Sequence, residues 1–259
     1  NSGWILLLNP TVDRWPSKSA KDQGQDILKP TFCCFAKEQP YHATMVMVSD
    51  SSVQEDSFLL GLISTWRKKN IFPLWGVCKS GATAQTLSTA WAHAPKTDFG
   101  LTIYAGNDFS NANSWSWNAQ IDDALHSLMT SSQHFCRRES FFFLNAAGFF
   151  PALKEHGYAE LMQAVRKILE KESLQVFDGQ AFVGKIQLRD SMHFHVGSTP
   201  QVVSMYSEVV IESMLSSSVN RAAPLTGAVG HEIPHLVCEL SKIVVSPMLP
   251  DPDSVSSDN

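Results

Sequence analysis

Apolar segments of two kinds alternate along most of this 259-residue chain, and this alternation limits its possible folds more than any other feature. Short β-rich apolar runs, such as residues 42–49 and 71–78, are typical of buried strands. The segments between them, such as residues 54–70 and 158–173, carry apolar residues at helical spacing. Strands and helices in alternation predict an α/β fold, a mostly parallel sheet with helices on both faces.

The remaining elements continue the same order. Strands are expected over residues 99–106, 140–148 and 174–179, and helices over residues 117–132 and 199–216. The last of these helices is expected to begin with Thr199 as its cap and Pro200 in its first turn.

The composition of the two ends differs from that of the middle. Residues 1–40 contain several prolines and a polar run, and we predict an irregular N-terminal extension there. Residues 41–216 form the predicted α/β domain, and residues 217–259, rich in Ser and Pro, form a C-terminal extension expected to be a loose tail. The chain begins without Met or a basic leader, so we interpret it as a fragment or a mature end.

Charge, hydropathy and cysteine usage exclude several classes of protein. The net charge is −5 without a basic stripe, so nucleic-acid binding is not expected. No apolar stretch approaches the roughly 20 residues that span a bilayer, so no transmembrane segment is expected. Five irregularly spaced cysteines predict neither a disulfide framework nor a zinc site, and the adjacent Cys33 and Cys34 are expected to be buried. The compartment and the oligomeric state stay open.

Two adjacent serines, Ser51 and Ser52, stand where the first predicted strand meets the first predicted helix. Ser52 opens a Ser-x-x-Glu pattern that ends at Glu55, which is typical of a capping box, so Ser52 is expected to cap the helix. Ser51 then lies at the strand-to-helix elbow, where nearby backbone N–H groups favour a nucleophile. The structural alternative for both serines is an ordinary turn.

A serine nucleophile needs a base for its proton and donors for the oxyanion that forms. Gly81 follows the second predicted strand, Asn107 follows the third, and Asp190 and His193 precede the last helix. Sites in parallel sheets lie at the carboxyl ends of the strands, so we expect these residues to converge there. The spacing of Asp190 and His193 lets the carboxylate reach the imidazole and fix its tautomer.

The order of these groups resembles that of the SGNH/GDSL hydrolase family. The segment VSDSSV (48–53) is similar to the family's first block, SGAT (80–83) to the second, AGND (105–108) to the third and DSMHF (190–194) to the last. The resemblance spans residues 41 to about 216 and implies a flavodoxin-like three-layer α/β/α sandwich.

The resemblance also implies a role for each group. Ser51 would be the nucleophile, His193 the general base and Asp190 the residue that orients it, while the Ser51 amide, the Gly81 amide and the Asn107 side chain would form the oxyanion hole. The implied activity is hydrolysis of an ester through an acyl-enzyme on Ser51, with a small-molecule, carbohydrate or lipid ester as substrate and with no cofactor or metal. Transfer of the acyl group to a sugar hydroxyl and a non-catalytic binding domain stay open as alternatives.

Two positions depart from the family pattern. Ser49 and Ala105 stand where the family usually has glycine. The sequence therefore raises the question of whether a Cβ at either place crowds an unusual backbone conformation.

Three other motifs are weighed against simpler interpretations. Residues 231–235 read HEIPH and match a zinc-binding pattern in letters, but Pro234 breaks the helix that the pattern needs, so a loop is expected. His195 is expected to be a loop residue. Trp115 and Trp117 are expected to cover the core, with stacking on a sugar ring as the functional alternative.

Overall fold

The computed structural model describes residues 4–8, 30–36, 41–110, 117–151, 153 and 157–218. The strands are β1 (Trp4–Leu8), β2 (Phe32–Ala36), β3 (Ala43–Ser49), β4 (Ile71–Cys78), β5 (Thr97–Tyr104), β6 (Cys136–Leu144) and β7 (Gln175–Asp178). The helices are α2 (Asp56–Lys68), α3 (Ala84–Ala92), α4 (Ala119–Phe135), α5 (Tyr158–Lys171) and α6 (Thr199–Ser218). None of these helices is long and apolar enough to cross a membrane.

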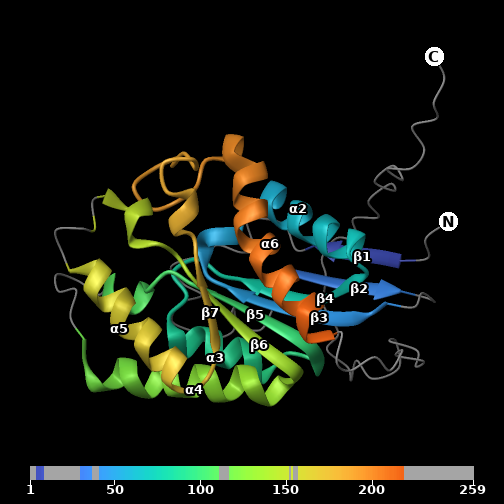
Figure 1. Ribbon diagram of the computed structural model, residues 1–259, viewed down its shortest axis with the longest axis horizontal. Helices are drawn as coiled ribbons and strands as arrows, with labels where there is room; N and C mark the ends of the chain where they lie inside the picture. Colours follow the sequence, from blue (N-terminus) through green and yellow to red (C-terminus); the bar gives the residue numbers. More distant parts are fainter. Residues whose placement is uncertain are drawn as a thin grey trace, which may run out of the picture.

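The strands form one seven-stranded sheet in the order β1-β2-β4-β3-β5-β6-β7. All pairings from β4 through β7 are parallel. Helices α2 and α6 cover one face of this sheet, and α3, α4 and α5 cover the other (Figure 1). The predicted α/β three-layer sandwich is therefore confirmed.

The order of the parallel strands indicates at which edge of the sheet a site is expected. From β3 the chain moves through α2 to β4 on one side, and from there through α3 to β5 on the other side of β3. This reversal is the switch point of a flavodoxin-like sheet, and ligands of such folds bind at the carboxyl ends of the strands beside it. Those ends, of β3 and β5, carry the first and third sequence blocks.

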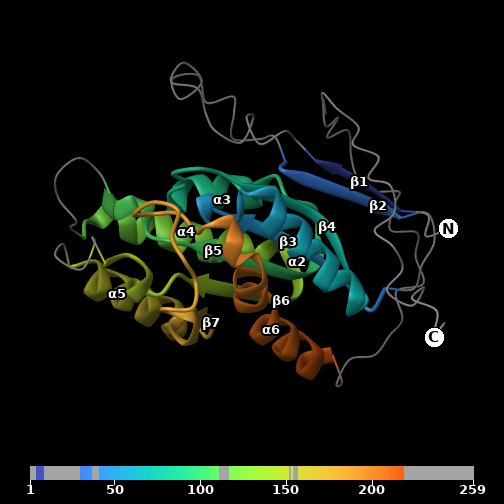
Figure 2. The same ribbon diagram turned by 90° about the horizontal axis from the view of Figure 1, so that it is seen from above.

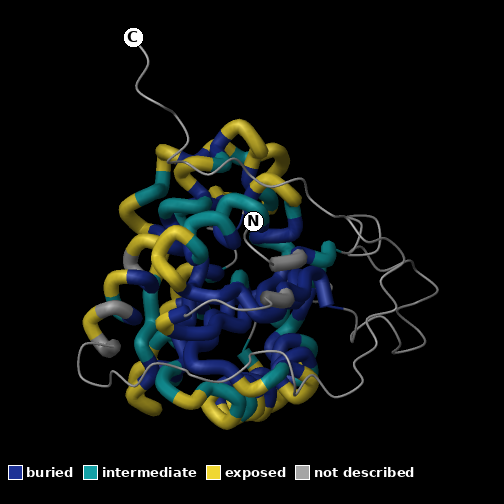
Figure 3. Tube along the Cα trace, turned by 90° about the vertical axis from the view of Figure 1, so that its right-hand side faces the viewer, coloured by how far each residue is buried: buried dark blue, intermediate teal, exposed yellow. Residues whose placement is uncertain are grey.

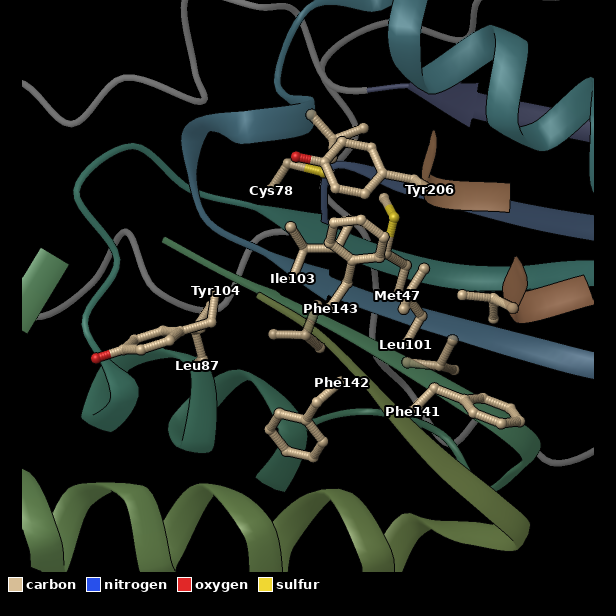
Figure 4. Close-up of a cluster of buried hydrophobic side chains, with 14 of the residues drawn as sticks. Met47, Cys78, Leu87, Leu101, Ile103, Tyr104, Phe141, Phe142, Phe143 and Tyr206 are labelled. Atoms are coloured by element: carbon tan, nitrogen blue, oxygen red, sulfur yellow. The ribbon is translucent and has the colours of Figure 1, made fainter. Parts of the chain in front are cut away.

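The central strands are buried on both faces, as a parallel sheet between two helical layers requires. Every residue of β3, β4 and β5 is buried, and the buried positions lie inside a shell of exposed ones (Figure 3). Neighbouring side chains of β6 point to opposite faces. Phe142 points toward α4, while Phe143 points toward Tyr206 of α6 (Figure 4).

The N-terminal segment departs from the sequence prediction. Within residues 1–40, predicted as irregular, β1 and β2 extend the sheet beyond β4 with antiparallel pairings (Figure 2). The apolar runs WILLL and FCCFA are long enough for edge strands, and the prolines of the segment lie outside them. Cys33 and Cys34 are buried, as expected. The bounds of a separate extension stay a prediction, and residues 219–259 of the predicted tail lie outside the described residues.

Element boundaries also differ from the prediction. The strand predicted over residues 140–148 is β6, Cys136–Leu144, and it begins within a charged stretch. Arg137, Arg138 and Glu139 lie at its less buried start, where the apolar pattern gives no sign of a strand. Helix α4 correspondingly extends to Phe135 and α6 to Ser218.

We expect Gly76→Ala to destabilise the contact between β2 and β4. A Cβ there would clash with Phe32 Cε1 and lie 3.0 Å from the Met47 carbonyl oxygen, so the buried ring must move at a cost of about 1–3 kcal/mol. The measurement is the free energy of unfolding in urea. Phe32→Leu is the matched control, and the double variant should lose less than the sum of the two single losses. Strict additivity would show that Phe32 does not pack on Gly76.

Candidate active site

The elbow after β3 is built around Asp50. The strand ends at Ser49, and a 3-10 turn, η3 (Ser51–Val53), follows at once. Asp50 is fully buried and caps this turn, since its Oδ1 accepts the Ser52 N–H at 2.9 Å. Ser51 is half-buried at the first position of the turn. The structure thus places Ser51 at the carboxyl end of the central strand.

The prediction that Ser52 caps the first helix is wrong. Helix α2 begins at Asp56 with Glu55 as its N-cap residue, and the Glu55 side chain makes no capping bond. Ser52 lies within the 3-10 turn and Glu55, not Ser52, is the N-cap residue, so a capping box does not form. The Ser52 hydroxyl instead donates to Asp50 Oδ1 at 2.5 Å and accepts from Asn145 Nδ2 at 2.7 Å.

The third block is joined to the first through the same carboxylate. Asp50 Oδ2 accepts the Ala105 N–H at 2.6 Å, which connects the ends of β3 and β5. Asn107 opens a second 3-10 turn, η4 (Asn107–Ser110), and its Nδ2 donates to the Ala82 carbonyl at 3.0 Å. Ala82 follows Gly81, so the loops that carry Gly81 and Asn107 are held together.

A second carboxylate strengthens this connection between the loops. Asp108 Oδ2 accepts the Ala84 N–H at 2.9 Å and the Tyr104 hydroxyl at 2.6 Å. Ala84 is the first residue of α3, where a negative charge is favoured by the helix dipole. The beginning of α3 is therefore anchored to the end of β5.

The two departures from the glycine pattern do not strain the backbone. Among the described residues that are not glycine, the positive φ angles belong to Asn70 and Ser173, so Ser49 and Ala105 have ordinary conformations. The left-handed positions of these blocks are Gly81, with φ of 65°, and Gly106, with φ of 73°. The backbone requirement for glycine falls on those two residues, and both are glycine here.

The last block forms a compact acid–imidazole pair. His193 Nδ1 lies 3.0 Å from both carboxylate oxygens of Asp190. Asp190 Oδ1 also accepts the N–H groups of Met192 at 2.7 Å and His193 at 2.8 Å. Partial burial acts to raise the pKa of Asp190, but these hydrogen bonds and the nearby imidazole outweigh it and lower the pKa to about 2. Asp190 is therefore a carboxylate at neutral pH.

The loop that carries His193 is bound to the start of α2, the helix that follows the Ser51 elbow. Arg189 Nη1 donates to Glu55 Oε1 at 2.6 Å, and Arg189 Nε lies 3.5 Å from Asp190 Oδ2. Behind the loop, the hydroxyls of Thr199 and Ser57 are hydrogen-bonded with their oxygens 3.1 Å apart. Thr199 has helical angles and lies inside α6, so it does not act as the expected cap.

An electrostatic influence also links the last block to the first. Burial raises the pKa of Asp50, and the influence of His193 is among those that oppose this rise. The four blocks thus meet at one edge of the sheet. The roles of Ser51, Gly81, Asn107, Asp190 and His193 stay predictions.

The other motifs fall into structural roles or lie outside the described residues. His195 Nδ1 accepts the Gly197 N–H at 3.0 Å and caps a short turn, as expected of a loop residue. Trp117 packs against the core and lies 5.8 Å from the Phe109 ring, in agreement with the structural interpretation. Trp115 and residues 231–235 are not among the described residues. Within the described ranges, no group of three or more His, Cys, Asp or Glu side chains is placed to hold a metal.

Sequence reasoning missed three residues that organise this site. Asn145 follows the end of β6 directly, so the strand-end rule that singled out Asn107 applies equally to it. Arg189 precedes the Asp-x-x-His segment, and its charge is the only hint of a partner at Glu55. Tyr206 lies within a helical pattern and gives no sign of its polar contact.

Comparisons with known proteins find likeness in fold. No family model matches the chain, and no curated protein matches it. A GDSL-like lipase from Bacteroides thetaiotaomicron superposes with a TM-score of 0.52 at 11% identity, covering 70% of this chain and 93% of that one. TesA superposes with a TM-score of 0.52 at 15% sequence identity, and the match covers 67% of this chain and 99% of TesA. A third structure is the esterase EstA from Pseudoalteromonas sp., inhibited by monoethylphosphonate. It superposes with a TM-score of 0.51 at 14% sequence identity, and the match covers 67% of this chain and 98% of EstA.

The lowered pKa of Asp190 makes part of the stability depend on pH. An unfolded Asp has a pKa of about 3.9. The stabilisation is therefore complete above that pH and is lost as the pH falls through the folded pKa of about 2. We expect the wild type to have a larger unfolding free energy than Asp190→Asn at neutral pH, and this difference to shrink as the pH falls from about 4 to about 2. Urea denaturation at a series of pH values measures it.

Asp123→Asn, at an exposed position of α4, is the control for the loss of one negative charge. The pH dependence should be larger for Asp190→Asn than for this control. Equal dependence in the two variants would contradict the assigned hydrogen bonds.

Proposed function

We propose that this chain, which has the fold of the SGNH/GDSL hydrolases, is a serine-dependent hydrolase of carboxylic esters. The observation that carries the proposal is the meeting of two units at one sheet edge. The Ser51 elbow is joined to the end of β5 through Asp50, and the Asp190–His193 pair is bound through Arg189 to Glu55, the N-cap residue of the helix that follows the elbow.

The proposed reaction begins at the Ser51 hydroxyl. Its oxygen attacks the ester carbonyl while Nε2 of His193 takes its proton, because Nδ1 faces Asp190. Asp190, ionised at neutral pH, accepts the Nδ1 hydrogen and stabilises the imidazolium. The C–O bond to the alcohol then breaks, the alcohol leaves with the proton from Nε2, and an acyl ester on Ser51 remains.

Water completes the cycle. His193 takes a proton from water, the hydroxide attacks the acyl ester, and Ser51 recovers its proton as the carboxylic acid leaves. All proton transfers run between His193, Ser51, the leaving alcohol and water. The proposed chemistry needs no redox step.

The proposed oxyanion hole is supported by the way its members are held. The donors are the backbone N–H groups of Ser51 and Gly81 and the side-chain amide of Asn107. A side-chain amide carries two hydrogens, and one of those on Asn107 is donated to the Ala82 carbonyl. This bond fixes the plane of the amide, and we assign Asn107 to the oxyanion hole on that ground. Donors fixed before the reaction stabilise the developing charge without reorganisation.

Two alternatives use the same cleft. Acyl transfer to a sugar hydroxyl replaces water with a carbohydrate in the second step, and the same residues perform it. A non-catalytic domain would bind a ligand without forming a bond to Ser51. A covalent probe separates this last alternative from both enzymatic ones.

We expect a fluorophosphonate probe to label the protein on Ser51, because an activated serine displaces fluoride from phosphorus. Mass spectrometry of the peptide that contains Ser51 provides the measurement. Ser51→Ala should abolish labelling, while Ser131→Ala, on α4 beneath the opposite face of the sheet, should label at the wild-type rate. A wild type that stays unlabelled would favour the binding domain.

We expect Asn107→Ala to lower kcat by roughly 10²–10³ through the loss of one oxyanion donor, with little change in KM. Hydrolysis of p-nitrophenyl acetate gives both constants. Asn118→Ala is a matched control, since Asn118 Oδ1 caps α4 by accepting the Ile121 N–H at 3.1 Å. This control should lose about 1 kcal/mol of stability with kcat unchanged. Equal kcat for Asn107→Ala and the wild type would remove Asn107 from the site.

A further inference from the structure

A line of hydrogen-bonded polar side chains, all buried except the half-buried Ser52, runs from helix α6 to the Ser51 elbow. The Tyr206 hydroxyl donates to Asn145 Oδ1 at 2.7 Å, and Asn145 Nδ2 donates to Ser52 Oγ at 2.7 Å. Ser52 Oγ then donates to Asp50 Oδ1 at 2.5 Å. Tyr206 and Asp50 are 0% exposed, Asn145 is 1% exposed and Ser52 is half-buried, so water is excluded from the bond between Tyr206 and Asn145.

The direction of each bond follows from the one before it. Burial raises the pKa of Tyr206 well above its usual value, and the charge of Asp50 adds to this, so the phenol keeps its proton and donates it. Asn145 therefore turns its oxygen to Tyr206 and its NH₂ group to Ser52. Because the Ser52 hydroxyl accepts from Asn145, its single hydrogen goes to Asp50.

The line ends on a carboxylate whose two oxygens are both occupied by donors. Oδ1 accepts the hydroxyl and the N–H of Ser52, and Oδ2 accepts the Ala105 N–H. A buried carboxylate without such partners costs several kcal/mol, so each donor helps to hold Asp50 in one orientation. That orientation matters because Asp50 caps the turn that begins with Ser51.

Packing fixes the far end of the line. The Tyr206 ring meets Phe143 edge to face with centroids 4.7 Å apart, and Figure 4 shows the two rings together. Tyr206 lies on α6, the helix that directly follows the loop of His193. The same helix therefore contacts the elbow through Tyr206 and continues from the segment of the proposed base.

We propose that Ser52, Asn145 and Tyr206 are positioning residues of the Ser51 site that act through Asp50. The inference rests on the proposed function, since it assigns a catalytic consequence to the orientation of the elbow. The three residues touch neither the substrate nor the reacting atoms. Their effect is on kcat, because a displaced Ser51 spends less time at attacking distance.

The test is a double-mutant cycle on kcat for p-nitrophenyl acetate. Ser52→Ala removes the last donor and should lower kcat by roughly ten- to a hundredfold, with KM nearly unchanged. Tyr206→Phe removes one hydroxyl at constant ring packing and should lower kcat by about threefold or more. In the Ser52→Ala background, Tyr206→Phe should have no further effect on kcat, because the line is already broken.

Two variants separate positioning from stability. Ser52→Thr keeps the hydroxyl and should recover most of the kcat lost in Ser52→Ala. Ser207→Ala removes another buried hydroxyl of α6, one that donates to the Val203 carbonyl at 2.6 Å outside the line, and should leave kcat unchanged. All rates are measured well below the melting temperature of each variant. Equal losses from Tyr206→Phe in both backgrounds, or no loss in either single variant, would overturn the proposal.

A measurement without turnover distinguishes this failure from failure of the proposed function. NMR of the Asn145 side-chain NH₂ group should show slow hydrogen exchange, and Ser52→Ala and Tyr206→Phe should each shift its resonances. Shifts without any labelling of wild-type Ser51 would reject the hydrolase and, with it, the catalytic part of the inference. Labelling and turnover with an additive cycle would reject the inference alone.

Discussion

The site depends on the hydrogen bonds that the buried carboxylate of Asp50 accepts. It lies at the end of the central strand, where burial would make a lone charge costly, and it is stabilised by donors from its own turn and from the end of β5. These bonds do more than satisfy a charge. They set the angle at which the chain leaves β3 and the separation between β3 and β5, so Ser51 and Asn107 begin their turns from fixed positions. A neutral side chain of the same shape would not accept both backbone donors and the hydroxyl together.

The sheet topology explains why distant segments reach this carboxylate. Successive strands are added first on one side of β3 and then on the other, which makes β3 and β5 neighbours, and α2 and α6 pack side by side on one face. Contact between those helices places the Asp190–His193 loop, which precedes α6, beside the start of α2. The ion pair of Arg189 with Glu55 is largely exposed and contributes little stability by itself. The ion pair instead positions the loop, because it fixes which part of the loop lies beside the start of α2.

Much of this arrangement follows from the sequence, because strand and helix periodicities are local signals. The alternation predicts the parallel sheet, and strand-end residues such as Asn107 follow from it. The roles of Ser52, Asn145 and Tyr206 are not local, since each depends on which of several polar partners the tertiary fold brings near. Ser52 illustrates the difference. Its Ser-x-x-Glu spacing fits a capping box. The hydrogen bond from the Ser52 N–H to Asp50 instead caps a 3-10 turn, and the helix begins only at Asp56. The strands β1 and β2 were missed because their runs are short and separated by prolines.

At the glycine positions of the family pattern, the residue type must be compared with the backbone angles at each position. Replacement of glycine at Ser49 and Ala105 suggests a damaged site if each glycine is taken as a backbone requirement. The backbone of both residues is ordinary, and the left-handed conformations fall on Gly81 and Gly106. At Gly106 a Cβ would also meet Met162 Sδ and Phe109 Cδ2, both at 2.9 Å, so conformation and space both require glycine there. Ser49 even contributes a bond, since its hydroxyl donates to the Asp50 carbonyl at 3.1 Å. The substitutions therefore occupy positions where a small side chain fits, and the positions that need glycine keep it.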